Sequence, residues 1–238
     1  MTRTTITRIF VDAALEEASD LILPSGEAHH LQNVLRARPG DIFEVVDATR
    51  ALFTAELHEG AEAVILSKLQ EPGRARAEVT LYQGVPKGKH MDLVVEKATE
   101  LGVGSVTPLV TERSIVRPDG RGGKVERWRK LAQSAARQSL QLRVPDVAEP
   151  VTFGEALRKV AGEGILLHNE PDLPALEEVV AGPSVSLFVG PEGGWSEREV
   201  ERAGDAGVPV AQLGPYRLRS ETAGIIAVAR AMAALERS

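Results

Sequence analysis

The sequence predicts an α/β protein with a small N-terminal domain of β-strands and a larger C-terminal domain built on a mainly parallel sheet. In the first seventy residues, short apolar runs alternate with turn signals, as they do in small barrels and sandwiches. From residue 77 on, apolar runs of strand length alternate with segments of helical spacing, which indicates a parallel sheet with helical crossovers. The polar stretch 70–76 contains Pro72-Gly73 and predicts a boundary between domains 1–72 and 73–238.

The N-terminal domain is expected to contain three strands and one short helix. The strands are predicted at 42–46, after the turn signal Arg38-Pro-Gly-Asp41, at 51–57 and at 63–67. The helix is predicted over 27–36, because Leu31, Val34 and Leu35 then share one face.

The C-terminal domain is expected to alternate strands and helices. Strands are predicted at 79–83, 106–110, 165–168, 185–190 and 208–213, and helices at 92–101, 124–142, 196 onward and 222–235. The third of these helices has a clear start signal, since Ser196-Glu-Arg-Glu199 is a capping box.

The final helix, 222–235, is apolar on nearly every side. A terminal helix cannot easily be buried all round in a domain of this size, so part of it is expected to pack against a second subunit. A helix buried in the core of one chain is the alternative.

Composition excludes several classes of protein. The chain of 238 residues contains no cysteine, which excludes a disulfide framework, a thiolate nucleophile and a cysteine metal site. No stretch approaches the roughly 18 to 20 consecutive apolar residues that cross a bilayer, and the N-terminus lacks the apolar core of a signal peptide. A cytoplasmic protein is the simplest expectation.

Positive charge is concentrated in one segment, although the net charge of the chain is −6. Residues 111–143 contain nine basic and three acidic side chains, which makes this segment basic in an acidic protein. Such a segment is either a solvated helix face or a surface that contacts the phosphates of a nucleic acid.

A ligand site is predicted where two apolar runs end in neighbouring loops. The run Ser186-Leu-Phe-Val-Gly190 continues into Pro191-Glu-Gly-Gly-Trp195, and a second run continues into Leu213-Gly-Pro-Tyr-Arg-Leu-Arg-Ser-Glu-Thr-Ala223. Because parallel strands end at the same edge of a sheet, the two loops would form one crevice. A tight strand-to-helix turn without a ligand is the alternative for the glycine-rich loop. His168 ends a further strand beside this crevice and is either a lining residue or a structural histidine.

Other kinds of site are excluded by spacing. The glycine loop lacks the G-x-G-x-x-G spacing of a dinucleotide site, and Gly84-Val-Pro-Lys-Gly-Lys-His90 is one residue too short for a P-loop. His29 and His30 are adjacent and diverge on a helix, so they cannot hold one metal together. No arrangement of residues suggests a metal site or acyl transfer.

The motifs at the crevice resemble those of the RsmE family, which are SPOUT-class methyltransferases that modify uracil N3 in small-subunit ribosomal RNA. The resemblance rests on Val189-Gly-Pro-Glu-Gly-Gly194 followed by Leu213-Gly-x-x-x-Leu-Arg-x-Glu-Thr-Ala223. It extends to His30-Leu-x-x-Val-Leu-Arg36 and to Lys97-Ala-Thr-Glu-Leu-Gly-Val103. The chain departs from the family at Gln138-Ser-Leu-Gln141, where Gln-x-x-Arg is usual, so no role is assigned to Gln141.

The resemblance implies a fold, a cofactor and partners. It implies an N-terminal PUA-like β-barrel that binds RNA, and a C-terminal SPOUT-type parallel sheet, flanked by helices, with a trefoil knot. It also implies S-adenosylmethionine as the cofactor, small-subunit (16S) ribosomal RNA as the substrate and a homodimer, without a metal or a membrane.

The resemblance also implies roles for particular residues. Arg219 would stabilise developing negative charge, and Glu221 would orient Arg219 or accept the N3 proton. The residues implied to bind the cofactor are Leu167, His168, Gly190, Pro191, Glu192, Gly194, Leu213, Gly214, Leu218 and Thr222. Arg36, Lys87 and Arg113 would bind RNA. The alternatives are another SPOUT methyltransferase, acting on a ribose 2′-hydroxyl or a guanine, and a non-catalytic RNA-binding ribosome-assembly factor.

Overall fold

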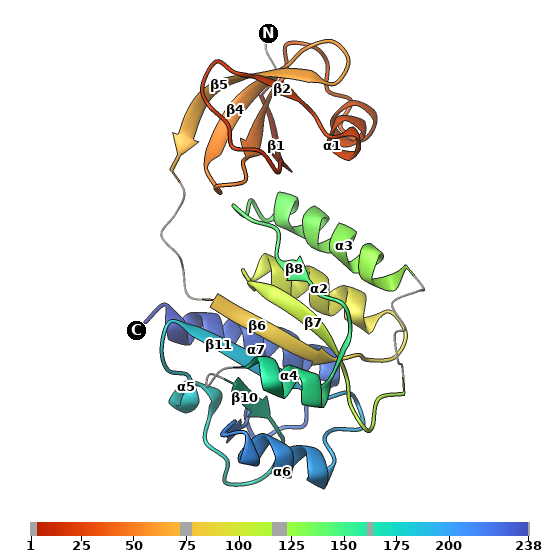
Figure 1. The fold of residues 1–238 in the computed structure, drawn as a ribbon, viewed down its shortest axis with the longest axis vertical. Coiled ribbons are helices and arrows are strands. Elements are labelled where there is room, and N and C mark those ends of the chain that lie inside the picture. Colours follow the sequence, from red (N-terminus) through yellow and green to blue (C-terminus); the bar gives the residue numbers. More distant parts are fainter. Residues whose placement is uncertain (1–3, 72–77, 116–122, 161–163, 238) are drawn as a thin grey trace. The chain divides into compact units, whose positions relative to one another are not determined.

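The computed structural model describes residues 4–71, 78–115, 123–160 and 164–237. The chain forms two compact units (Figure 1). The N-terminal unit comprises Met1–Ala75 and Ala136–Val144, and the C-terminal unit comprises Arg76–Ala135 and Pro145–Ser238. The predicted boundary at 72/73 and the basic residues Arg117 and Arg121 lie outside the described residues.

The N-terminal unit contains a five-stranded sheet in the order β1-β3-β4-β5-β2. The strands are β1 (Thr4–Phe10), β2 (Asp20–Ile22), β3 (Ile42–Val46), β4 (Leu52–Leu57) and β5 (Glu62–Gln70). The three predicted strands are β3, β4 and β5, and they pair as antiparallel neighbours. Strands β1 and β2, which form the two edges of the sheet, were not predicted from the sequence. Buried Ile9, Phe43 and Phe53 belong to the core of this unit.

The predicted helix 27–36 is present but irregular. It consists of α1 (Ser25–His29), which continues directly into a π-helical turn, η1 (His30–Val34). Leu31 is fully buried, as predicted, whereas Val34 is 60% exposed. The wider π-helical turn changes the angle between successive side chains, so Val34 leaves the apolar face that regular helical spacing predicts. Arg36, beyond this turn, has a positive φ of 56°.

Two arginines connect residues 136–144 to the rest of the N-terminal unit. Arg137 donates to the buried carboxylate of Glu27 over 2.5 Å, and Arg8 donates to the carbonyl of Leu140. Burial raises the pKa of Glu27, and the neighbouring Arg137 only partly opposes that effect.

The C-terminal unit is built on a parallel sheet in the order β12-β10-β11-β6-β7-β8, with β9 paired to β7. The strands are β6 (Glu78–Gly84), β7 (Ser105–Val110), β8 (Asp146–Val147), β9 (Val151–Thr152), β10 (Gly164–Leu167), β11 (Ser184–Val189) and β12 (Val210–Ala211). Every pairing in this sheet is parallel, which confirms the predicted class of the C-terminal domain.

Helices cover both faces of this sheet (Figure 1). They are α2 (His90–Glu100), α3 (Lys124–Gln138), α4 (Phe153–Lys159), α5 (Leu176–Val179), α6 (Glu197–Asp205) and α7 (Ser220–Leu235). On one face, α7 packs on β6 and β11 and also contacts α2 and α5. On the other face, Phe153 of α4 and Ala203 of α6 join a core with Tyr82 and Phe188, whose rings stack 4.8 Å apart.

Residues 213–219 lead from the edge strand β12 back to α7 on the central strands. The knot itself stays a prediction of the resemblance.

Two helix ends test the start and stop signals. The capping box at Ser196 is present, because the Ser196 hydroxyl accepts from the backbone N–H of Glu199 and the Glu199 carboxylate accepts from that of Ser196. The helix predicted over 124–142 ends earlier, at Gln138. Leu140, with a φ of 55°, is in the left-handed region, which is incompatible with a continued helix.

Among the described residues, no helix is both long and apolar enough to span a bilayer.

Candidate functional site

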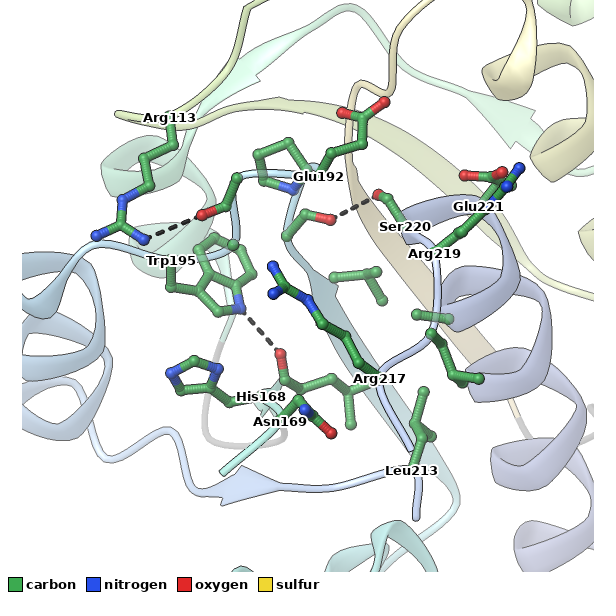
Figure 2. Close-up of a pocket in the computed structure, with 18 of the residues that line it drawn as sticks. Arg113, His168, Asn169, Glu192, Trp195, Leu213, Arg217, Arg219, Ser220 and Glu221 are labelled. Atoms are coloured by element: carbon green, nitrogen blue, oxygen red, sulfur yellow. Dashed lines mark hydrogen bonds between the residues drawn. The ribbon is translucent and has the colours of Figure 1, made fainter. Parts of the chain in front are cut away.

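A cavity of about 800 Å³ lies at the carboxyl edge of the parallel sheet (Figure 2). Its walls come from three segments: 167–170 at the end of β10, 189–195 at the end of β11, and residues of 213–221 with Ala223, in the loop after β12 and the first turn of α7. Lys87, His90 and Arg113 complete the lining. The volume lies within the range of small-molecule and cofactor sites.

The glycine loop after β11 is held rigidly by its neighbours. The backbone N–H of Gly194 donates to the carbonyl of Pro191 over 2.8 Å, which closes a turn. Arg113 Nη1 donates to the carbonyl of Gly193 over 3.0 Å, and the backbone N–H of Lys87 donates to the Glu192 carboxylate over 2.8 Å. The loop is therefore attached to the segments that follow both β6 and β7.

Trp195 closes one side of the glycine loop. Its ring is 4% exposed, and its Nε1 donates to the carbonyl of Leu167 over 2.9 Å (Figure 2). The indole therefore joins the end of β11 to the end of β10 and fixes two walls of the cavity relative to each other.

The second loop is joined to the first through Ser220, the first residue of α7. The Ser220 hydroxyl donates to the carbonyl of Gly190 over 2.6 Å (Figure 2) and accepts from Nε2 of fully buried Gln83 over 2.9 Å. Gly84, next to Gln83, permits the close approach of this loop, since a Cβ there would lie 2.5 Å from the nitrogen of Pro191.

Arg219 and Glu221 lie at the start of α7. Arg219 is the N-cap residue and is exposed, whereas the side chain of Glu221 is only 9% exposed. In Figure 2 the side chain of Arg217 extends across the cavity towards Trp195. Nδ1 of His90, the first residue of α2, lies 3.4 Å from Oε1 of Glu221.

The cavity brings together most of the residues that the sequence predicted for the site. Those that line it are Leu167, His168, Gly190, Pro191, Glu192, Gly194, Leu213, Gly214, Leu218, Arg219, Glu221, Lys87 and Arg113. Thr222 is half-buried on α7 and does not line the cavity. Arg36 belongs to the N-terminal unit.

Several residues that line the cavity were not predicted from the sequence. Arg217, Tyr216 and Ser220 were seen in the motif but assigned no role, and His90 was considered only as the last residue of a segment too short for a P-loop. The lone histidine carried no usable signal, because its partner Glu221 lies on a different helix. His168, which was predicted, has its Nε2 3.2 Å from Oε1 of Glu170.

Two family profiles match the chain. One, described as an RNA methyltransferase domain, matches residues 74–232, and the other, described as an RNA methyltransferase PUA domain, matches residues 23–69. The PUA match confirms the predicted type of the N-terminal domain. Together the profiles match both units of the structure.

Individual relatives agree with these profiles. The ribosomal RNA small subunit methyltransferase E of Synechocystis is 36% identical over 90% of this chain and 73% of its own length. A methyltransferase from Legionella pneumophila, solved in complex with bound SAM, superposes with a TM-score of 0.88 at 29% identity over 98% of both chains. A ribosomal RNA small subunit methyltransferase E from Neisseria gonorrhoeae, solved bound to S-adenosyl methionine, has a TM-score of 0.85 at 31% identity over 95% of this chain and 96% of its own.

Proposed function

Because the chain belongs to the ribosomal RNA small subunit methyltransferase E family, we propose that it transfers a methyl group from S-adenosylmethionine to uracil N3 in 16S ribosomal RNA. One observation carries this proposal: a single cavity holds nearly all the predicted cofactor residues together with Arg219 and Glu221. The family profile supports the class of reaction, and the motif resemblance supports the choice of N3.

The residues at the cavity suit S-adenosylmethionine. Gly194 and Gly214 have positive φ angles of 69° and 120°, and a Cβ at either position would meet no protein atom within 4 Å. At both glycines the backbone therefore faces free space, and a ligand can approach it closely. Leu167, Leu213 and Leu218 offer apolar surface to an adenosine, and charged side chains of both signs at the rim suit the charged groups of a methionine moiety.

The proposed cofactor residues are those that the resemblance assigned. They are Leu167, His168, Gly190, Pro191, Glu192, Gly194, Leu213, Gly214 and Leu218, with Thr222 behind them on α7. When bound, S-adenosylmethionine supplies an electrophilic methyl group on a positively charged sulfur.

The chain's own residues must make uracil N3 nucleophilic. N3 carries a proton at neutral pH, so the site needs a proton acceptor and stabilisation of the negative charge that develops on O2 and O4. Glu221 accepts the proton, and Arg219 stabilises the charge. In a duplex N3 is engaged in base pairing, so the target uridine is unpaired or extruded when it enters the cavity.

The two domains have different roles in the reaction. Residues 1–72 form the RNA-binding domain, to which Arg36 contributes, and residues 73–238 form the methyltransferase domain. Lys87 and Arg113 line the cavity and contact the RNA backbone near the target nucleotide. The enzyme works as a cytoplasmic homodimer and without a metal. Among the described residues, no group of three or more His, Asp or Glu is placed to hold a metal ion.

Mapping methylated 16S ribosomal RNA by mass spectrometry, in cells with and without the gene, tests the proposed function. We expect one N3-methyluridine to disappear with the gene and to return on complementation. Loss of a ribose 2′-O-methyl or a methylguanine instead would assign a different methyltransferase. Isothermal titration separates the non-catalytic alternative, since an assembly factor without activity would bind no S-adenosylmethionine at millimolar concentration.

A further inference from the structure

The imidazole of His90 and the carboxylate of Glu221 form a pair at the start of two packed helices. Nδ1 of His90, on α2, lies 3.4 Å from Oε1 of Glu221, on α7, and both residues line the cavity. A hydrogen bond needs a slightly shorter separation, and catalytic hydrogen bonds are often long before the substrate is bound.

The two members of this pair differ in their access to water. The side chain of Glu221 is 9% exposed, whereas that of His90 is 49% exposed. A proton taken up by the Glu221 carboxylate therefore has little direct contact with solvent, and the nearby imidazole offers it a route outward.

We propose that His90 receives from Glu221 the proton that leaves uracil N3 and passes that proton to solvent. The inference rests on the proposed function and assigns a proton-relay role to a residue outside the family motifs described above. It requires His90 to be neutral at Nδ1 when the reaction begins.

The proton and the electron pairs balance in this scheme. The N3–H bond breaks and its proton moves to the Glu221 carboxylate, while the N3 electron pair forms the new bond to the methyl carbon. The bond from that carbon to sulfur breaks, and its electron pair stays on sulfur. The proton then moves from Glu221 to Nδ1 of His90, and Nε2 of the imidazolium releases a proton to water. Glu221 is a carboxylate again at the end of the cycle.

The relay has a chemical advantage over a carboxylate alone. In peptides an imidazole is more basic than a carboxylate by about two pK units, so the proton moves favourably from Glu to His. An imidazole also exchanges protons with water near neutral pH. His90 therefore returns Glu221 to its basic form.

Other ionisable groups line the same cavity and contribute to its field. They are Lys87, Arg113, His168, Glu170, Glu192, Arg217 and Arg219. Lys89 precedes His90 directly in the chain. All five arginines and lysines among these groups are exposed, so solvent screens their effect on the His90–Glu221 pair.

Steady-state methylation of 16S ribosomal RNA by His90→Ala, measured over many turnovers and across pH at saturating S-adenosylmethionine, tests the relay, because His90 resets Glu221 between turnovers. We expect the rate to fall about 10- to 100-fold, toward the lower end of the range for proton transfer by a positioned side chain. The wild-type rate should rise with pH near neutrality, and we expect this rise to be absent from the variant. Added imidazole should restore the rate, because the site is open to solvent. His90→Gln, which keeps the size but not the basicity, should behave as His90→Ala does.

Two further variants separate the relay from other effects. Glu221→Gln should lose activity that imidazole does not restore, because the first proton acceptor is missing. Glu201→Ala is the control: Glu201 is exposed on α6 of the C-terminal unit and does not line the cavity. It should keep the rate and pH profile of the wild type.

Failure of the proposed function can be distinguished from failure of the proton relay. If the wild-type protein forms no N3-methyluridine, the proposed function is wrong. If the wild type methylates N3 but both His90 variants keep its rate and pH profile, the relay is overturned. The same holds if the His90 variants bind the cofactor and keep the wild-type circular dichroism, yet imidazole restores nothing.

Discussion

At the scale of single residues, the start of α7 gives Arg219 and Glu221 opposite surroundings. Arg219 is exposed, whereas Glu221 lies in the first turn of α7, with its carboxylate facing His90. A carboxylate in the first turn is also favoured by the helix dipole. Arg219 is therefore open to solvent and to a ligand, whereas Glu221 is largely shielded from solvent. The motif predicted that the two belong to one site, but this difference depends on the packing of α2 against α7.

The exposed position of Arg219 leads to a prediction about catalysis. Arg219→Ala should lower the rate of methyl transfer about 10²- to 10³-fold, the usual cost of removing one group that stabilises developing negative charge. Binding of S-adenosylmethionine, measured by isothermal titration, should change little, because the glycine loop is held by Arg113, Lys87 and Ser220 instead. Arg219→Lys should retain part of the rate. Full transfer by Arg219→Ala would remove the residue from the mechanism.

Asp47 leads to a prediction about stability and pH. Burial tends to raise the pKa of this carboxyl, but hydrogen bonds from the Thr49 hydroxyl and from the backbone N–H groups of Leu15, Ala51 and Thr49 outweigh burial and lower it. A lowered pKa in the folded state means that Asp47 stabilises the fold above the unfolded pKa, about 3.9. This contribution is lost as the pH falls through the lower, folded value. Asp47→Asn should therefore cost roughly 1 to 3 kcal/mol at neutral pH.

Urea unfolding at several pH values checks the role of Asp47. The free energy of unfolding of the wild type and of Asp47→Asn should converge once the pH falls below the lowered pKa of Asp47 in the folded state, because the carboxyl is then protonated in both states. A difference that stays constant from neutral to acidic pH would show that packing, rather than the ionised carboxylate, causes the loss.

At the scale of elements, prediction succeeded where a local signal decided the outcome. The capping box at Ser196 and the apolar runs of β3, β6 and β11 needed no distant partner. The edge strands β1 and β2 were missed, because they form by pairing with β3 and β5 rather than through their own pattern. The helix over 27–36 was found, but its π-helical turn was not, since hydrophobic spacing does not distinguish two nearby helical periods.

The two capping boxes lead to a prediction about helix stability. In α6, Glu199 is 1% exposed, and its carboxylate accepts from the backbone N–H groups of Ser196 and Glu112. Glu199→Ala would leave two donors without their partner, so we expect a loss of about 2 kcal/mol or more in urea unfolding. In α4, Glu155 holds the equivalent place beside Thr152 but is exposed. Glu155→Ala is therefore the matched control and should cost clearly less. If both variants lose the same free energy of unfolding, the contact of Glu199 with Glu112 does not stabilise the fold.

At the scale of the whole molecule, the sequence predicted where the site lies better than how it is built. Parallel strands end at one edge, so the loops after β10, β11 and β12 had to meet there, and the cavity confirms this. The contacts that make the site rigid join residues far apart in sequence, such as Trp195 to Leu167 and Gln83 to Ser220. Such pairs have no signature in a single sequence, because each depends on the register of several strands and helices.

The outer face of α7 bears on the proposed homodimer. The helix packs on β6, β11, α2 and α5, yet Ile226 remains 38% exposed and Ala233, two turns further on, is also exposed. Arg230, one turn beyond Ile226, donates to Glu177 of α5, and the hydrogen bonds of this pair lower the pKa of Glu177. Ile226, Arg230 and Ala233 thus share one face of α7, where the Arg230–Glu177 pair borders two exposed apolar side chains that a second copy would cover in the proposed dimer.

Replacing Ile226 with glutamate should weaken that dimer. A charge placed in an apolar interface loses its hydration without gaining a partner, so the dissociation constant should rise at least tenfold, or about 1.4 kcal/mol. Sedimentation equilibrium measures this shift, and an unchanged far-ultraviolet circular dichroism spectrum would show that the monomer keeps its fold. Ile22→Glu is the control, because Ile22 is 79% exposed on β2 in the N-terminal unit and should not affect the dimer. If the wild type sediments as a monomer, or if Ile226→Glu sediments as the wild type does, then the outer face of α7 has another role.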